Sequence, residues 1–196
     1  FLGAAALLAP ENLSAETFKG YDLFYIEGYL VQSYALIEKA VKLAKEAGLT
    51  VAIDMASFNI VEQNIDFLLK IIPQYVDIVF ANEEEAFALT QLPAEGAVSK
   101  INEMTDLAIV KTGDKGSWVQ QGDFKEKIGA NKVTCMDATG AGDLYAAGFI
   151  YGLAQKKDLT TCAKIGTLLG GEVIQVIGPK IPNNRWAYIK DEIAKM

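Results

Sequence analysis

The stretch Ile78-Val79-Phe80-Ala81 is apolar throughout, and Asn82 and a helical pattern follow it without a spacer. A short strand that is apolar on every side chain has both faces buried, whereas a strand with one wet face alternates. The same pairing of an apolar run with a helical segment recurs before and after this stretch. The predicted strands cover residues 23–26, 51–53, 78–81 and 107–110, and the predicted helices cover 33–47, 61–72 (closed by Pro73), 83–89 and 97–104. The alternation predicts an α/β fold with a parallel sheet flanked by helices.

The pattern changes after Val110, where glycines divide the chain into shorter segments. The predicted elements here are hairpin strands at 117–121 and 124–128, a β-like run at 132–136, and helices at 141–155, 159–177 and 185–195. Residues 1–196 show no internal repeat and no linker. We therefore expect a single domain.

Composition excludes several classes of function. The chain has no histidine, which excludes a Ser-His-Asp triad, a Cys-His pair and a His-based zinc site. Its 18 Lys and Arg against 25 Asp and Glu give a net charge of −7, which argues against a nucleic-acid partner. Cys135 and Cys162 have neither metal-site spacing nor a disulfide framework around them. A reducing, cytoplasmic compartment is favoured.

No apolar run reaches the roughly 20 residues of a membrane span, so no membrane partner is expected. The first ten residues are apolar but lack the basic region and the starting Met of a signal peptide. We expect that residue 1 lies inside a longer protein, of which this chain is a C-terminal portion.

The segment expected to carry chemistry is Asp137-Ala138-Thr139-Gly140-Ala141-Gly142-Asp143. Two glycines remove side chains where the backbone enters a helix, so that amide N–H groups and the positive end of the helix dipole face open space. Such an arrangement binds phosphate. Asp143 falls in the first helical turn, where a carboxylate can accept a proton from a hydroxyl that attacks the phosphate. The structural alternative is a glycine-rich turn in which an Asp caps a helix.

The helix that follows this turn also carries a packing signal. Leu144, Ala147, Gly148 and Tyr151 fall on one helical face. A face with small and apolar residues predicts close packing against a neighbouring element.

The segment from Asp137 to Phe149 resembles the C-terminal signature of the ribokinase-like (pfkB) family of carbohydrate and nucleoside kinases, with Ala138 in place of the usual Thr. The resemblance implies a ribokinase-like fold and ATP-dependent phosphotransfer. It also implies that the backbone amides of Gly140, Ala141 and Gly142 form an anion hole for the transferred phosphate. The residue that matches the family's catalytic base is Asp143.

Two further motifs agree with this resemblance. Asn82-Glu83-Glu84-Glu85 resembles the family's Asn-x-x-Glu motif, in which Asn82 and Glu85 would help to place Mg²⁺, through water, and the ATP phosphates. Taken alone, the same two residues also form a helix capping box. Gly113-Asp114-Lys115-Gly116 resembles the Gly-x-x-Gly turn beside the nucleotide, with a hairpin turn as the alternative. The resemblance assigns Gly113, Gly116 and Lys111 to the ATP site, although many relatives carry Thr or Ser at the position of Lys111.

The resemblance has three weaker features: a candidate cation site, a similarity to one subgroup of the family, and the lack of several family motifs. Asp137 and the Thr139 carbonyl match positions that bind a monovalent cation in relatives, which implies K⁺. Residues 25–30 and 2–5 resemble adenosine-kinase-like bacterial members. The family's Gly-Gly motif, its sugar-binding aspartate and its β-sheet lid are not found in the chain. The isolated chain is therefore expected to be inactive, and a homodimer through the lid is implied for the longer protein.

The function implied is transfer of the γ-phosphate of ATP to a hydroxyl of an adenosine-like nucleoside. Two alternatives stay open: a ribokinase- or fructokinase-like sugar kinase, and a non-catalytic nucleotide-binding module. A dinucleotide-binding dehydrogenase is disfavoured, because its glycine motif follows the first strand of a βαβ unit. Here the glycine turn comes late and is followed by helices.

Overall fold

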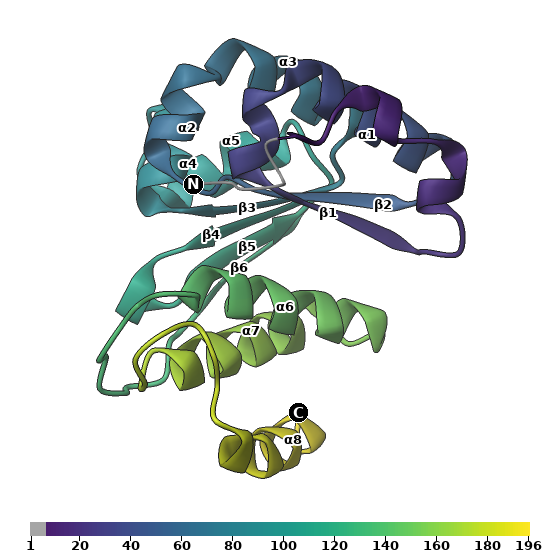
Figure 1. Cartoon of the computed structure of the whole chain (residues 1–196). Helices are drawn as coiled ribbons and strands as arrows, with labels where there is room; N and C mark the ends of the chain where they lie inside the picture. Colours follow the sequence, from purple (N-terminus) through teal and green to yellow (C-terminus); the bar gives the residue numbers. More distant parts are fainter. Residues whose placement is uncertain (1–6) are drawn as a thin grey trace. The chain divides into compact units, whose positions relative to one another are not determined.

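The structure is a computed structural model that describes residues 7–196, so the motif at residues 2–5 lies outside the described residues. Its six strands form one sheet in the order β1-β2-β3-β4-β5-β6 (Figure 1). The strands are β1 (Leu23–Glu27), β2 (Thr50–Asp54), β3 (Ile78–Asn82), β4 (Leu107–Lys111), β5 (Ser117–Gln121) and β6 (Phe124–Ile128). The α-helices are α1 (Tyr34–Glu46), α2 (Phe58–Gln63), α3 (Ile65–Tyr75), α4 (Glu83–Thr90), α5 (Ala94–Asn102), α6 (Ala141–Ala154), α7 (Leu159–Val173) and α8 (Trp186–Ala194). Short 3₁₀ segments are η2 (Pro10–Asn12), η3 (Ala15–Phe18), η4 (Gly28–Gln32), η5 (Gly113–Lys115) and η6 (Asn183–Arg185).

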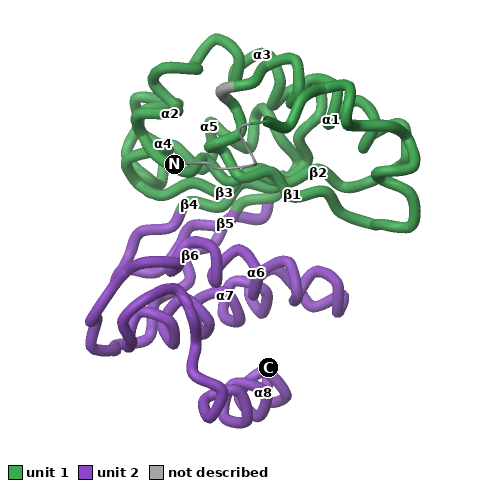
Figure 2. Tube along the Cα trace, in the orientation of Figure 1, with its two compact units in different colours: residues 1–110, 120–122 green, residues 111–119, 123–196 purple. Residues whose placement is uncertain are grey.

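The chain divides into two compact units, shown in separate colours in Figure 2. Unit 1 comprises residues 1–110 and 120–122, and unit 2 comprises residues 111–119 and 123–196. Each unit is described below by itself. The single-domain organisation of residues 1–196 stays a prediction.

Unit 1 contains the parallel part of the sheet. Leu23 of β1 lies opposite Thr50 of β2, and Asp54 of β2 lies opposite Phe80 of β3, all in parallel register. Residues 51–53 and 78–81 are buried without interruption, as their apolar runs predict, and Asp54 at the end of β2 is buried as well. Helices α1 and α3 lie on the same side of these strands (Figure 1). The α/β class and its parallel sheet are confirmed.

One helix of unit 1 differs from its prediction. The helix expected over 61–72 is two helices, which meet at Asn64. The buried Asn64 side chain donates to the Ile60 carbonyl at 2.7 Å and accepts from the Tyr34 hydroxyl at 2.9 Å. At the break between the two helices, the Asn64 side-chain amide donates to the Ile60 carbonyl in place of a backbone N–H. Pro73 does not end α3, which runs two residues further to Tyr75.

Unit 2 contains the helix pair α6–α7, the strand β6 and the first residues of β5. A two-residue connection, 122–123, joins β5 to β6, and a connection this short requires antiparallel strands. Helices α6 and α7 approach through glycines. A Cβ on Gly148 of α6 would lie 2.8 Å from the Ile165 carbonyl oxygen, and one on Gly152 would lie 2.8 Å from Cys162 Sγ. Close backbone packing therefore fixes α6 against α7.

The predicted packing face of α6 is confirmed in part. Gly148 packs against α7 and Leu144 packs against the core formed by α7 and α8, whereas Ala147 and Tyr151 are exposed. The buried residues of α6 are Tyr145, Ala146, Gly148, Phe149 and Gly152. Periodicity gives only part of this face because α6 is apolar around most of its circumference, so the small residues decide where α7 packs.

Two other boundaries in unit 2 differ from expectation. Residues 132–136 form no strand; they are exposed, and the Met136 N–H donates to the Ile174 carbonyl at 2.7 Å. Helix α7 ends at Val173 rather than at 177. The β-like run thus pairs with the end of a helix instead of with a strand.

Helix α8 is held to unit 2 by a small core and an ion pair. Ile181, Ile189 and residues of α7 share this core. Arg185 donates two hydrogen bonds to the buried Glu172 carboxylate, at 2.7 and 2.8 Å. None of the helices in residues 7–196 combines the length and the apolarity that crossing a bilayer requires.

Candidate functional site

The glycine turn of unit 2 leads directly into α6, as the sequence predicts. Gly140 precedes the helix with φ +80°, a left-handed conformation that glycine adopts without strain. A Cβ there would also lie 2.8 Å from Pro179 Cβ. The Ala141 N–H closes the turn on the Ala138 carbonyl at 3.1 Å, and the Leu144 N–H bonds to the Gly140 carbonyl at 2.9 Å. The turn is therefore rigid before any ligand binds.

The first turn of α6 presents unbonded amides. Within residues 7–196, the N–H groups of Gly142 and Asp143 donate to no protein acceptor. The first N–H groups of a helix lack intrahelical partners and lie at the positive end of its dipole. Sequence reasoning placed the anion hole on Gly140, Ala141 and Gly142. In this conformation the Ala141 amide is used inside the turn, whereas the amides of Gly142 and Asp143 are available at the helix start. The anion-hole role of Gly140, Ala141 and Gly142 stays a prediction.

A positive charge lies beside these amides. A Cβ on Gly142 would stand 3.2 Å from Nζ of Lys111, the last residue of β4. Lys111 is partly buried, and both residues belong to unit 2. An ammonium and helix amides that converge in this way favour an anion more strongly than either feature alone.

The side chain of Asp143 is exposed, whereas Tyr145, two residues further along α6, is buried. Each residue of an α-helix advances by about 100°, so these two side chains leave the helix on nearly opposite sides. The buried side fixes the helix and the exposed side offers a carboxylate next to the unbonded amides.

The Gly113–Gly116 turn is built around the Gly116 carbonyl. The backbone N–H and the hydroxyl of Thr112 both donate to that carbonyl, at 2.7 and 2.9 Å. Gly116 has φ +92°, and a Cβ there would lie 1.8 Å from the Ile128 carbonyl oxygen. Only glycine fits. The tight turn between β4 and β5 agrees with the hairpin interpretation, and the ATP-site role of Gly113 and Gly116 stays a prediction.

The Asp137 carboxylate stabilises its own loop through hydrogen bonds. Its carboxylate accepts from the Thr139 N–H at 2.9 Å, from the Thr139 hydroxyl at 2.6 Å and from the Gly178 N–H at 2.8 Å. These hydrogen bonds, led by that of the Thr139 hydroxyl, hold the pKa of Asp137 below its usual value. A carboxylate has about four lone-pair sites, so most of its acceptor capacity serves the loop.

In unit 1, Asn82 and Glu85 form the capping box that the sequence offered as the structural alternative. The Asn82 N–H and side-chain amide donate to the two Glu85 carboxylate oxygens, both at 2.7 Å, and Asn82 Oδ1 accepts from the Glu85 N–H at 2.8 Å. Glu85 is buried, whereas Glu83 and Glu84 are exposed. The motif therefore starts α4 as a helix cap, and its part in placing Mg²⁺ stays a prediction.

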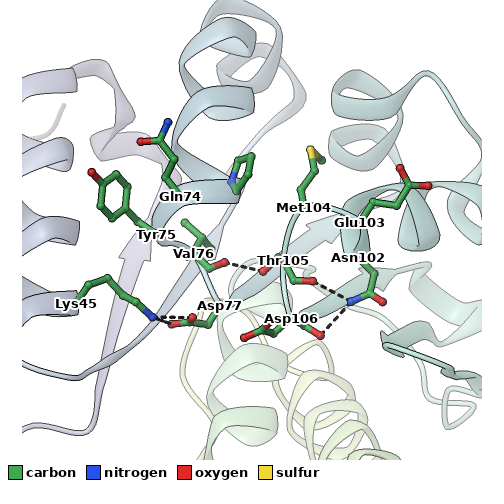
Figure 3. A pocket seen from close by; sticks show the side chains of 11 residues that line it. Lys45, Gln74, Tyr75, Val76, Asp77, Asn102, Glu103, Met104, Thr105 and Asp106 are labelled. Atoms are coloured by element: carbon green, nitrogen blue, oxygen red, sulfur yellow. Dashed lines mark hydrogen bonds and ion pairs between the residues drawn. The ribbon is translucent and has the colours of Figure 1, made fainter.

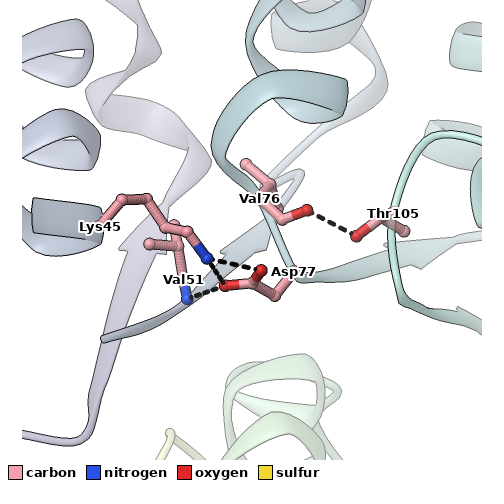
Figure 4. Close-up of polar contacts among 5 residues, drawn as sticks. All are labelled: Lys45, Val51, Val76, Asp77 and Thr105. Atoms are coloured by element: carbon pink, nitrogen blue, oxygen red, sulfur yellow. Dashed lines mark hydrogen bonds and ion pairs between the residues drawn. The ribbon is translucent and has the colours of Figure 1, made fainter. Parts of the chain in front are cut away.

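A polar groove of about 380 Å³ lies at the amino ends of β3 and β4 (Figure 3). Asp77 accepts from the Val51 N–H at 2.7 Å and from Lys45 Nζ at 2.7 and 2.8 Å (Figure 4). Thr105 donates to the Val76 carbonyl at 2.8 Å. These groups satisfy one another and tie strands to loops. Ligands of open α/β sheets bind at the carboxyl ends of the strands, where Asn82 and Lys111 stand, so we interpret the groove as structural.

Sequence reasoning missed two contributors to the site. Thr112 holds the Gly113–Gly116 turn, and Ser117 hydrogen-bonds to Tyr145 at 2.7 Å. Both residues flank the Gly-x-x-Gly motif, so their polar side chains beside a turn were the available signal. The family resemblance points to a supporting loop near Gly178 but gives no alignment for it, and the structure shows the Gly178 N–H bonded to Asp137.

The fold defines a class: an α/β protein with parallel strands, an antiparallel hairpin and a glycine turn that opens a helix. Residues 1–186 match the pfkB family of carbohydrate kinases, and the chain belongs to that family. An adenosine kinase of Sinorhizobium meliloti has a TM-score of 0.87 and 32% identity, over 94% of this chain and 58% of that one. A probable sugar kinase of Rhizobium etli has a TM-score of 0.87 and 30% identity, over 95% and 59%.

Curated relatives give the same picture. The adenosine kinase of Saccharomyces cerevisiae is 29% identical over 96% of this chain and 60% of its own. An uncharacterized sugar kinase of Archaeoglobus fulgidus is 24% identical over 91% of this chain and 71% of its own. The chain thus spans about three fifths of the length of three of these four relatives.

Proposed function

We propose that the protein that carries this chain transfers the γ-phosphoryl group of MgATP to a hydroxyl group of a nucleoside, with adenosine-like nucleosides as the first candidates. The start of α6 carries the proposal. There the exposed Asp143 carboxylate lies in the same helical turn as two unbonded amides, and Lys111 approaches Gly142. A carboxylate in an anion site hinders simple phosphate binding, but it is required when a hydroxyl must lose its proton.

In the proposed reaction, Asp143 accepts the proton of the acceptor hydroxyl as that oxygen bonds to the γ-phosphorus. The bond between this phosphorus and the β–γ bridging oxygen breaks, and ADP leaves. The amides of Gly142 and Asp143 and the ammonium of Lys111 offset negative charge on the transferring group. Phosphoryl transfer depends mainly on such positioning and charge stabilisation.

Mg²⁺ is implied by the family, and the residues present fit a water-mediated role. Both Glu85 carboxylate oxygens accept from Asn82, and residues 7–196 contain no group of three or more Cys, Asp or Glu arranged to hold a metal. Mg²⁺ commonly keeps several waters and takes one or two carboxylates together with substrate phosphates. Asn82 and Glu85 would thus hold waters of the ion, which neutralises phosphate charge when bound.

The remaining family expectations enter the proposal with specific residues. K⁺ would take the Thr139 carbonyl and the acceptor capacity that Asp137 retains. The adenine nucleotide would lie along the Gly113–Gly116 turn. The homodimer and the cytoplasmic location belong to the longer protein, and residues 1–196 alone would bind ATP without turnover.

A panel of acceptors tests the proposal. ADP release by the full-length protein is measured with adenosine, ribose and fructose at saturating MgATP. Preference for adenosine supports the nucleoside kinase. Preference for ribose or fructose supports the second candidate, a sugar kinase, which is favoured by the names of the R. etli and A. fulgidus relatives. ATP binding without ADP release for any acceptor would contradict both and leave the nucleotide-binding module.

A further inference from the structure

A buried hydrogen bond joins the two glycine motifs of unit 2. The hydroxyls of Ser117 and Tyr145 lie 2.7 Å apart. Ser117 is fully buried and Tyr145 is 7% exposed. Burial raises the pKa of the Tyr145 phenol well above its ordinary value, so the group stays neutral and keeps its hydrogen at physiological pH.

On one side, this bond is attached to the Gly113–Gly116 turn. Ser117 directly follows Gly116 and starts β5. The Gly116 carbonyl is held by two hydrogen bonds from Thr112, and the Gly116 Cα packs against the Ile128 backbone. A side chain that follows such a constrained turn has little freedom to shift.

On the other side, the bond is attached to the start of α6. Tyr145 lies one half-turn after Asp143, on the opposite side of the helix. A Cβ on Gly166 of α7 would lie 2.7 Å from the Tyr145 carbonyl oxygen, and one on Gly170 would lie 3.2 Å from the Ala141 carbonyl oxygen. The backbone from Ala141 to Tyr145 is therefore fixed from the α7 side, and Ser117 fixes it from the β5 side.

We propose that the Ser117–Tyr145 hydrogen bond is a positioning contact, which sets the Gly113–Gly116 turn and the Asp143 carboxylate in one fixed geometry for phosphoryl transfer. This inference rests on the proposed function. Both residues are buried, so direct contact with the nucleotide or the acceptor is not part of this proposal. They act through the turn and through the helix, and so they affect the rate more than the binding of a single ligand.

The test uses Tyr145→Phe, Ser117→Ala and the double variant in the full-length protein. Each single variant removes the bond, and kcat is expected to fall about five- to fifty-fold, less than the ~100-fold that a 1 Å misplacement can cost. The KM for ATP changes less than kcat. Tyr151→Phe is the matched control, because Tyr151 is an exposed tyrosine on the same helix; its kcat is expected to be unchanged.

The double variant separates positioning from stability. Ser117→Ala leaves the Tyr145 hydroxyl buried without its partner, which lowers Tm, whereas removal of both partners recovers part of the loss. Positioning predicts that kcat stays low in the double variant although Tm recovers. If kcat recovers together with Tm, or if both single variants keep wild-type kcat and KM while folded, the proposal is overturned.

Failure of this proposal is distinguishable from failure of the proposed function. Asp143→Asn is assayed in parallel. An active Asp143→Asn variant overturns the kinase mechanism itself. An inactive Asp143→Asn variant beside a fully active Tyr145→Phe variant overturns only the positioning contact.

Discussion

Gly142 leaves room for the side chain of Lys111, because a Cβ on Gly142 would lie only 3.2 Å from the Lys111 ammonium nitrogen. The lysine ends β4 and the glycine lies in the first turn of α6. The missing side chain of Gly142 leaves this room beside the first turn of α6. Both contributions to the anion site thus depend on the same missing Cβ.

Gly142→Val is expected to weaken nucleotide binding at least several-fold, because the branched side chain displaces the ammonium and crowds the amides. Lys111→Met should weaken binding in the same direction while leaving the amides in place. Isothermal titration with MgATP measures both. Gly96→Val, on α5 in unit 1, is the control, since a Cβ there meets only the Leu92 side chain, at 3.4 Å or more. Unchanged affinity in both site variants, with the fold intact, would refute the anion site.

Asp143→Asn is expected to lower kcat by about 10²–10⁴-fold, because removal of a positioned general base typically costs that much. ATP affinity should change little, because the amide backbone is retained. Steady-state kinetics and titration of the full-length protein measure the two quantities. Asp123→Asn, at an exposed hairpin position, is the control. A kcat within a few-fold of wild type would show that Asp143 is not the base.

Glu85→Gln is expected to raise the Mg²⁺ concentration needed for half-maximal rate, whereas Glu84→Gln leaves it unchanged. Glu85 accepts two hydrogen bonds from Asn82 and is buried, and Glu84 is exposed. Gln retains one acceptor oxygen, so the capping box also weakens and Tm falls. Mg²⁺ titrations at fixed ATP separate these effects: a lower Tm with an unaltered Mg²⁺ requirement would leave Glu85 a purely structural cap.

Asp137 predicts a pH dependence of stability. Its pKa in the folded protein lies below the ordinary value of 3.8, chiefly because the Thr139 hydroxyl and the Gly178 and Thr139 amides bind its ionised form. A lowered pKa stabilises the fold above the unfolded-state pKa, and the contribution disappears as the pH falls through the folded-state pKa. Asp137→Asn should therefore lower Tm at pH 7 and have a smaller effect near pH 2. Thermal melts across this range, with Asp123→Asn as the control, measure the difference. An equal effect at both pH values would contradict the assignment.

The sequence predicts β2, β3 and β4 well because these strands are short and apolar on both faces. The hairpin strands at 117–121 and 124–128 match their predicted bounds, and α4 begins at the predicted capping box. The errors arise where tertiary contacts override local pattern. Asn64 splits a helix through a bond to Tyr34, thirty residues away in the chain. Residues 132–136 have strand-like composition but pair with the end of α7.

In the candidate site, too, features formed by neighbouring residues can be predicted from the sequence, whereas contacts between distant segments cannot. Gly140, Gly142 and Asp143 lie close together in sequence, so their arrangement at a helix start follows from the order of residues. The approach of Lys111 to Gly142 and of Gly178 to Asp137 joins distant segments, and no local periodicity reports it. Ser117 and Tyr145 are chemically ordinary, and only their burial together reveals the hydrogen bond.

The glycine contacts between α6 and α7 also restrict how this protein can change over evolution. At Gly148, Gly152 and Gly166 any side chain would meet backbone or sulfur atoms within 3 Å. Nearly every substitution at these positions is therefore expected to lower the stability of the folded protein. The position of α6, which carries Asp143, is therefore constrained by its packing against α7. Under the proposed function, differences in acceptor preference are therefore expected to depend on residues outside this helix pair.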